Sequence, residues 1–157
     1  MKLLTVIAAS VLWFCVSANC AHAQMVAAPC GVPMVPGPVA TALSSMCPSG
    51  PIIVFNPQFF QQLGIYGPPM FRYMQAHECA HHMNGDVVAG AMDPQGMLMI
   101  NPQIELRADC TAARILKAAG DLQALQIAIN FWAQSGNMPT GPNYPTGNQR
   151  AQMLSSC

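Results

Sequence analysis

Charged side chains are scarce in this sequence. Six acidic and six basic residues make up 8% of its 157 residues, whereas charged residues are about a quarter of an ordinary soluble domain. Removing Lys2 leaves five bases against six acids, so the chain lacks the basic surface that binds nucleic acid or anionic lipid. The scarcity makes each acid informative, because few carboxylates are available as metal ligands or as a catalytic base.

Long apolar runs are also lacking, except at the start of the chain. Lys2 is followed by the apolar stretch Leu3 to Val16 and then by Ala21-His22-Ala23, the pattern of an export signal with an A-x-A cleavage site. We expect cleavage after Ala23, which leaves 157 − 23 = 134 residues in the periplasm or outside the cell. The alternative is an uncleaved membrane anchor, for which the run is short. No later stretch could cross a bilayer, so no stable membrane insertion is expected after cleavage.

Five of the seven cysteines belong to the expected mature chain: Cys30, Cys47, Cys79, Cys110 and Cys157. An oxidising compartment favours disulfides, with the odd cysteine left free or paired between molecules. Two bridges among five cysteines can form in 5 × 3 = 15 ways, and the sequence does not choose among them. Cys30 with Cys47 is the most local pairing. Cys79 with Cys110 would join two predicted helices, although Cys79 lies about 200° around its helix from His77.

The N-terminal part of the mature chain is predicted to be irregular. Residues 24–50 carry five prolines among small residues, and a helical turn around 40–46 is the only element indicated there. Residues 51–55 are the best strand in the sequence, because they are β-branched and closed by Asn56-Pro57. We therefore expect a signal peptide over 1–23, an irregular segment over 24–50 and one domain over 51–157.

Helices are expected to fill most of that domain. Four kinds of signal mark the limits of these helices. They are proline in a first turn, an Asn or Asp cap, a capping box at Thr146 and Gln149, and glycine after a last turn. The expected helices are 58–63, 67–84, 101–120, 122–134 and 146–157, and residues 86–100 are expected to be irregular. The predicted fold class is α+β and mostly helical, with one short β-sheet.

The hexapeptide His77-Glu78-Cys79-Ala80-His81-His82 contains three of the four histidines and reads H-E-x-x-H. Residues four apart lie on one helix face, so His77 and His81 can direct both imidazoles at one metal ion. Glu78 can then reach a metal-bound water and take its proton. His82 cannot join the same ligand face and is expected to pack nearby.

The placement of this motif favours a metal site over histidines with a structural role. Met70, Phe71 and Met74 continue at helical spacing into His77 and His81, so the two ligands extend the core-facing stripe of the helix. The alternative is a helix whose histidines are satisfied in the core or solvated at the surface.

A third histidine ligand is missing. No histidine follows His82, whereas a catalytic zinc takes three protein ligands and leaves one position for water. The third ligand must therefore be an acid, unless another chain supplies a histidine. Three acids beyond the motif are poor candidates. Asp86 follows the motif too closely to fold back, Asp93 lies in a predicted turn, and Asp121 is expected to cap a helix.

Glu105 and Asp109 remain, four residues apart on one helix face. Glu105 can coordinate the metal, and Asp109 can accept the free ring N–H of a ligand histidine, for which His77 is the first choice. Such a bond sets the tautomer of the ligand and strengthens it. The alternative is a solvated acidic face paired with Arg107 or Arg114.

With these residues the chain resembles the gluzincin zinc metallopeptidases. Their minimal pattern is H-E-x-x-H on one helix and E-x-x-x-D on the next. Here the two parts are His77 to His81 and Glu105 to Asp109, and the glutamate stands 105 − 81 = 24 residues after the second histidine. In order of elements the resemblance covers Ile52 to Arg150, but its specific letters are confined to two helices.

Two further features are similar to the HtpX-like branch of that family. Asp86 follows the second histidine by five residues, and a proline-and-arginine segment runs from Tyr144-Pro145 to Arg150, although a histidine commonly precedes the proline in that branch. The sequence lacks the membrane helices of HtpX-type enzymes. It looks instead like the soluble, single-domain minigluzincins.

The resemblance implies zinc-dependent hydrolysis of a peptide or protein substrate. Zinc would polarise the scissile carbonyl and lower the pKa of its bound water toward about 7. Glu78 would take the water proton and pass it to the leaving amine. Tyr144 and Arg150 are the candidate donors to the oxyanion, with Tyr66 and Tyr73 as rivals.

Two other functions fit the same residues. One is a zinc hydrolase that acts on an amide or ester outside peptides. The other is an exported binding protein that keeps zinc as a structural element without catalysis. The strand over 52–55 would either be an edge that pairs with an extended substrate or be core sheet.

Overall fold

A computed structural model of the protein describes residues 26–93 and 101–157. Its sheet consists of β1 (Val26–Ala27), β2 (Pro33–Pro36), β3 (Ala42–Cys47) and β4 (Gly50–Phe55), in the order β1-β2-β4-β3. β3 and β4 form an antiparallel hairpin, and β2 runs parallel to β4. The strand expected over 51–55 is confirmed as β4. β4 lies between β2 and β3, so it belongs to the core of the sheet and is not an edge with which a substrate could pair.

The prediction of an irregular segment over 24–50 is wrong, because its described part supplies three of the four strands. The prolines stand where a strand tolerates them: Pro33 and Pro36 are the first and last residues of β2. The helical turn expected around 40–46 is instead β3, which pairs with β4 along its whole length. Pairing with a neighbouring strand decides this segment, and local composition does not show it. The predicted signal peptide lies outside the described residues.

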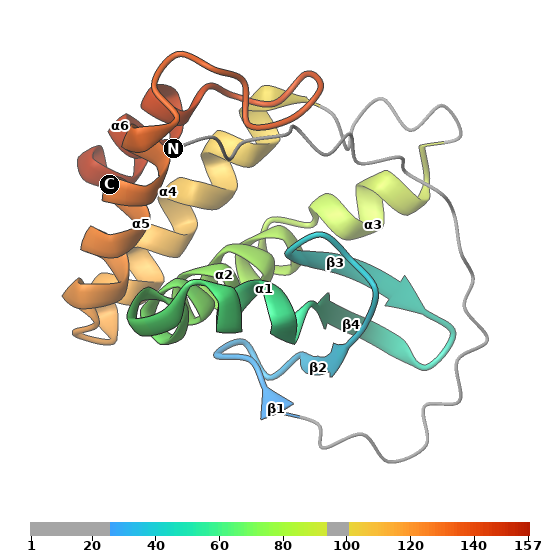
Figure 1. The fold of residues 1–157 in the computed structure, drawn as a ribbon. Helices are drawn as coiled ribbons and strands as arrows, with labels where there is room; N and C mark the ends of the chain where they lie inside the picture. Colours follow the sequence, from blue (N-terminus) through green and yellow to red (C-terminus); the bar gives the residue numbers. More distant parts are fainter. Residues whose placement is uncertain (1–25, 94–100) are drawn as a thin grey trace.

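The helices follow their sequence signals. Side chains of Asn56, Asn101, Asp121 and Thr146 accept backbone N–H groups at the starts of four helices, and the capping box with Gln149 is present. The helical elements are α1 (Pro57–Gln62), the short 3-10 helix η1 (Gly64–Tyr66), α2 (Gly67–Met83), α3 (Asp86–Ala91), α4 (Pro102–Ala118), α5 (Leu122–Gln134) and α6 (Gly147–Ser156). The expected α+β, mostly helical fold is confirmed (Figure 1).

The expectation of an irregular stretch over 86–100 is wrong where α3 forms. Gly85 adopts a left-handed φ of 78° between α2 and α3, a conformation that glycine reaches without steric cost. The chain can therefore end one helix and begin the next within two residues. Residues 94–100 lie outside the described residues.

α2 lies between the sheet and the other long helices (Figure 1). It packs against α4 and α5 on one side and against β3 on the other, and α6 packs on α4 and α5. Fully buried alanines on α2 and α4 allow the two helices to approach closely; these are Ala76, Ala80, Ala108 and Ala112. Among the helices that the structure describes, none combines the length and the apolar character needed to cross a bilayer.

Two disulfides join distant parts of the chain. Cys30 pairs with Cys79, and Cys110 pairs with Cys157, while Cys47 has no disulfide partner among the described residues. Neither of the two pairings considered from the sequence forms. Cys79 does point away from the side of His77, as its helical position indicated, and it meets the turn between β1 and β2. Two disulfides are typical of a protein that folds in an oxidising compartment.

Candidate metal centre

His77 and His81 on α2 and Glu105 on α4 bring three potential ligand atoms together. These atoms lie within 4.8 Å of one another, and the three residues are buried. The two histidine Nε2 atoms are 3.1 Å apart. Glu105 places Oε2 3.3 Å from Nε2 of His77 and Oε1 3.5 Å from Nε2 of His81. This group could hold a metal ion.

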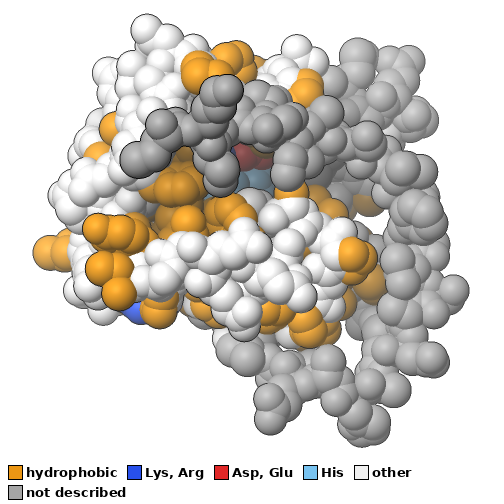
Figure 2. All heavy atoms as spheres, viewed as in Figure 1, with side chains coloured by type: hydrophobic (Ala, Val, Ile, Leu, Met, Phe, Trp, Pro, Cys, Tyr) orange, Lys and Arg blue, Asp and Glu red, His pale blue; other side chains and the backbone are white. Residues whose placement is uncertain are grey.

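The group is buried. In the space-filling view only a small area of acidic and histidine surface is visible, beside hydrophobic side chains (Figure 2). Glu105 is only 7% exposed, so it does not belong to a solvated acidic face. The burial also makes the group expensive to leave without a cation, because carboxylates and imidazoles lose water there.

Asp109 fixes the orientation of His77. Its Oδ1 lies 3.0 Å from Nδ1 of His77, and its side chain is fully buried. Arg150 donates to both oxygens, with Nε to Oδ2 and Nη2 to Oδ1 at 2.8 Å each. Burial would raise the pKa of Asp109, but the charge and hydrogen bonds of Arg150, together with His77, hold it well below its usual value. The ionised carboxylate can only accept, so Nδ1 of His77 carries a proton and Nε2 faces the ligand group.

Tyr73 and Trp132 complete the hydrogen bonds behind Asp109. Tyr73 donates its hydroxyl proton to Oδ1 of Asp109 at 2.6 Å and accepts from Nε1 of Trp132 at 2.9 Å. Nη2 of Arg150 also donates to the tyrosine oxygen at 3.2 Å, and its guanidinium carbon lies 3.9 Å from the centre of the Trp132 ring. Tyr73 is fully buried, so this chain of bonds is shielded from water.

Asp86 fixes the orientation of His81, as Asp109 fixes that of His77. Its Oδ2 lies 3.0 Å from Nδ1 of His81, and its Oδ1 accepts from Arg107. Burial would raise the pKa of Asp86, but His81 and Arg107 lower it. The argument that Asp86 lies too close to the motif to fold back is therefore wrong. The left-handed turn at Gly85 is the signal that could have revealed it.

The surroundings of His77 favour its protonated form. Burial would lower the pKa of His77, but hydrogen bonds to Asp109 and Glu105 outweigh it and raise this pKa from 6.5 to about 10. Burial would raise the pKa of Glu105, but the hydrogen bond and charge of His77, with the charges of Arg150 and His81, lower it. A positive charge between these side chains is thus stabilised at neutral pH.

Glu78 is buried beside His77, and a residue of the sheet holds its side chain. Ser44 of β3 donates its hydroxyl to Oε2 of Glu78, 2.7 Å away, and lies 2.8 Å from the backbone carbonyl of the same residue. His82 points elsewhere, with Nε2 3.2 Å from the carbonyl oxygen of Ile52 in β4. The sheet therefore contacts α2 at residues that lie between and just beyond the two ligands.

The two candidate oxyanion donors lie in different surroundings. Tyr144 is half-buried, and burial together with the charges of Glu105 and Glu78 raises its pKa to about 12. Its phenol therefore stays protonated as a donor. Arg150 uses Nε and Nη2 to hold Asp109 and Tyr73, so it supports His77 from behind. Of the rivals, Tyr73 is engaged with Asp109, and Tyr66 is 55% exposed.

Sequence reasoning missed the part that four residues play around the group: Ser44, Tyr73 as a support of Asp109, Asp86 as a support of His81, and Trp132. Tyr73 precedes His77 by one helical turn, so its place on the same stripe could have been read from the sequence. Ser44 and Trp132 carry no such signal, because they reach Glu78 and Tyr73 across 34 and 59 residues of chain.

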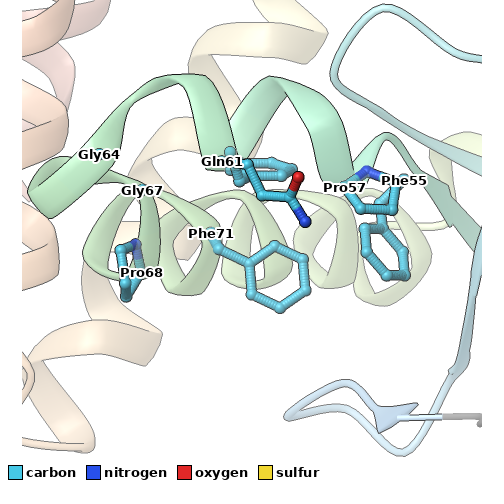
Figure 3. A pocket seen from close by; sticks show the side chains of 8 residues that line it. Phe55, Pro57, Gln61, Gly64, Gly67, Pro68 and Phe71 are labelled. Carbon is cyan, nitrogen blue, oxygen red and sulfur yellow. The ribbon is translucent and has the colours of Figure 1, made fainter.

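A separate apolar groove lies at the other end of α2 (Figure 3). Its volume is about 400 Å³, and aromatic rings and prolines line it, among them Phe55, Pro57, Phe60 and Phe71. Gln61 is its one polar side chain apart from backbone, and no titratable group lines it. The groove has no group that could carry out catalysis, so the histidine and glutamate group is the candidate site.

Comparison of the chain with protein-family models, with curated proteins and with solved structures gave no match. The assignment of a function therefore depends on the geometry of the site itself.

Proposed function

We propose that the protein is an exported zinc-dependent metallopeptidase, with His77, His81 and Glu105 as zinc ligands and Glu78 as general base. The observation that carries the proposal is the state of the two histidines. Both Nδ1 atoms are held by buried carboxylates, and both Nε2 atoms meet Glu105 at one point. Each ligand is thus supported by a carboxylate, as is usual for histidines that bind zinc.

The donor set and its spacing support zinc. Two imidazoles and one carboxylate are a common set for catalytic zinc, with ligand distances of about 2.0–2.1 Å. In a tetrahedral site of that size, neighbouring donor atoms are about 3.3–3.4 Å apart. The two Nε2 atoms are 3.1 Å apart and lie 3.3 and 3.5 Å from different oxygens of Glu105. The residues fit the ion once one carboxylate oxygen turns toward both imidazoles, or if both oxygens bind it.

The remaining groups fit the hydrolysis of an amide bond. Zinc, when bound, supplies a Lewis acid and lowers the pKa of a coordinated water to about 7. Glu78 takes the proton of the attacking water and later passes it to the leaving amine, which departs as a neutral molecule. Tyr144, which keeps its phenolic proton, can donate to the oxyanion of the substrate. Asp109 and Asp86 keep both ligand imidazoles with Nε2 toward the site.

The position of β3 at the end of the sheet supports an extended peptide as substrate. β3 pairs with β4 on one side and has no strand on its other side among the described residues. It also packs on α2 next to Glu78. A free edge offers backbone groups with which an extended chain can pair. This edge takes the place that the sequence analysis considered for β4.

Metal content and turnover together test the proposal. The purified protein should bind one zinc ion and cleave peptides from a library of varied sequence. His77→Ala should lose the zinc, and Glu78→Gln should keep the zinc but lose cleavage. The proposal fails if the protein binds no zinc, or if Glu78→Gln cleaves as fast as the natural protein. Bound zinc without peptide cleavage would instead favour a binding protein or a hydrolase for another amide or ester.

A further inference from the structure

Ser44 is a buried hydroxyl that reaches the proposed active site from the sheet. It lies on β3 and is only 5% exposed, and among the described residues its hydroxyl hydrogen-bonds only to Glu78, at two oxygen atoms of that residue. The distances are 2.7 Å to the carboxylate Oε2 and 2.8 Å to the backbone carbonyl. A serine hydroxyl has a single proton to donate, so the two contacts compete for it.

The carboxylate is the stronger of the two acceptors. In an α-helix the carbonyl of Glu78 already accepts the N–H of the residue four positions on, which is His82. The carboxylate has no such partner, and hydrogen bonds to an ionised group are about twice as strong as those between neutral groups. The proton of Ser44 therefore goes to Oε2 while Glu78 is ionised.

The contact leaves the two carboxylate oxygens in different states. Ser44 holds Oε2, whereas Oε1 has no hydrogen-bond partner among the described residues. A general base needs one free oxygen at a fixed position, and a displacement of about 1 Å can cost 100-fold in rate. Glu78 meets both conditions, because one oxygen is held and the other is free.

We infer that Ser44 is a positioning residue: it holds Glu78 by Oε2 and so presents Oε1 to the water that Glu78 deprotonates. The inference rests on the function proposed above for Glu78. It gives the edge strand β3 a second part in the reaction, because the strand that offers a free edge also orients the base. The Ser44 hydroxyl makes no hydrogen bond to His77, His81 or Glu105 among the described residues.

The test compares zinc-loaded variants at Ser44 with a control one residue away. Ser44→Ala removes the hydroxyl. Ser44→Thr and Ser44→Val add nearly the same bulk, but only threonine keeps the hydroxyl. Ser45→Ala is the matched control, because successive strand residues point to opposite faces. Crystal structures report the position of Glu78, and zinc affinity, KM and kcat for a cleaved peptide are measured for each variant.

The inference predicts a split between binding and turnover. Ser44→Ala and Ser44→Val should show Glu78 displaced or in several conformers, with kcat lowered about 10- to 100-fold and with KM and zinc affinity within twofold of the natural protein. Ser44→Thr and Ser45→Ala should behave like the natural protein. If Ser44→Ala does not fold, the comparison of threonine with valine decides the question by itself.

Two results would overturn the inference. In one, Ser44→Ala and Ser44→Val leave Glu78 in place or keep kcat within twofold of the natural protein. In the other, zinc affinity falls as far as kcat, which would make the serine merely structural. A natural protein that binds zinc but cleaves nothing would refute the proposed function instead. The crystallographic comparison of Glu78 would then still decide whether Ser44 positions it.

Discussion

Asp109 accepts the Nδ1 proton of His77 at 3.0 Å and is itself held on both oxygens by Arg150. The three side chains come from α4, α2 and α6, so one hydrogen-bond network connects three helices at a candidate metal ligand. All three are buried, and removing one partner of a buried charge pair costs about 3–5 kcal/mol. The network therefore contributes to folding as well as to the proposed metal binding, and changes at Asp109 or Arg150 would mix the two effects.

A change at Asp86 should separate the effect on zinc affinity from the effect on stability. Asp86→Asn should lower zinc affinity about 10- to 100-fold, because the amide no longer favours the tautomer of His81 that faces the metal. Stability should change less than at Asp109, since the partner Arg107 has a side chain 55% exposed and can be solvated. Competition with a zinc chelator measures the affinity. Asp121→Asn, which also removes an acid that pairs with an arginine, should leave zinc affinity unchanged; an equal loss in both variants would contradict the role of Asp86.

Tyr73→Phe should destabilise the protein by about 2 kcal/mol. It removes the hydroxyl between Trp132 and Asp109 at a fully buried position, and an unpaired buried donor costs about 1–3 kcal/mol. Urea unfolding of the zinc-free protein measures the change. Tyr66→Phe is the control, because that side chain is 55% exposed and should shift the free energy of unfolding by less than about 0.5 kcal/mol. Equal stabilities for the two variants would show that the buried bonds contribute nothing.

The zinc-free protein should be most stable between about pH 4.5 and 6.5. The raised pKa of His77, from 6.5 to about 10, adds stability that is complete below 6.5 and is lost as the pH rises through 10. The lowered pKa of Glu105 acts in the opposite sense: its contribution is complete above the ordinary value of 4.5 and is lost on acidification. Thermal unfolding from pH 4 to 10 measures both limbs.

Zinc should change this profile in a defined direction. The ion takes the place of the His77 proton, so zinc binding releases that proton at neutral pH and strengthens as the pH rises toward 10. Titration calorimetry in buffers with different ionisation enthalpies counts the released protons. Release of no proton at pH 7, or a zinc-free protein that is more stable at pH 9 than at pH 6, would show that His77 is neutral before zinc binds.

The cluster of candidate ligands could be predicted because the decisive information is local. His77 and His81 share a helix face by spacing, and Glu105 and Asp109 do so on the next long helix. With so few acids in the chain, elimination was enough to join the two pairs. The helix limits are local too, since caps such as Asn101 and Asp121 act within three residues.

What the sequence could not show depends on contacts between distant segments. The strands of the proline-rich segment exist because β3 and β2 pair with β4, which no local pattern encodes. The disulfides close separations of 49 and 47 residues. Asp86 is a different case, since it is close in sequence but needs the left-handed turn at Gly85 to fold back.

The disulfides should contribute a large part of the stability, and they adjoin the site. Cys79 is the neighbour of Glu78, and Cys110 is the neighbour of Asp109. Closing a loop of nearly 50 residues is worth about 4 kcal/mol in the chain-entropy model, against about 5–15 kcal/mol for a whole domain.

Replacing either pair by serine should therefore lower the free energy of unfolding by about 4 kcal/mol, measured by urea unfolding of the zinc-free protein. Cys47→Ser is the control, because Cys47 forms no disulfide among the described residues and its replacement should change little. Zinc should restore part of the loss, since it joins α2 to α4 through three buried side chains and binds only the folded protein. If the serine variants unfold at the same urea concentration as the natural protein, the disulfides contribute nothing to its stability.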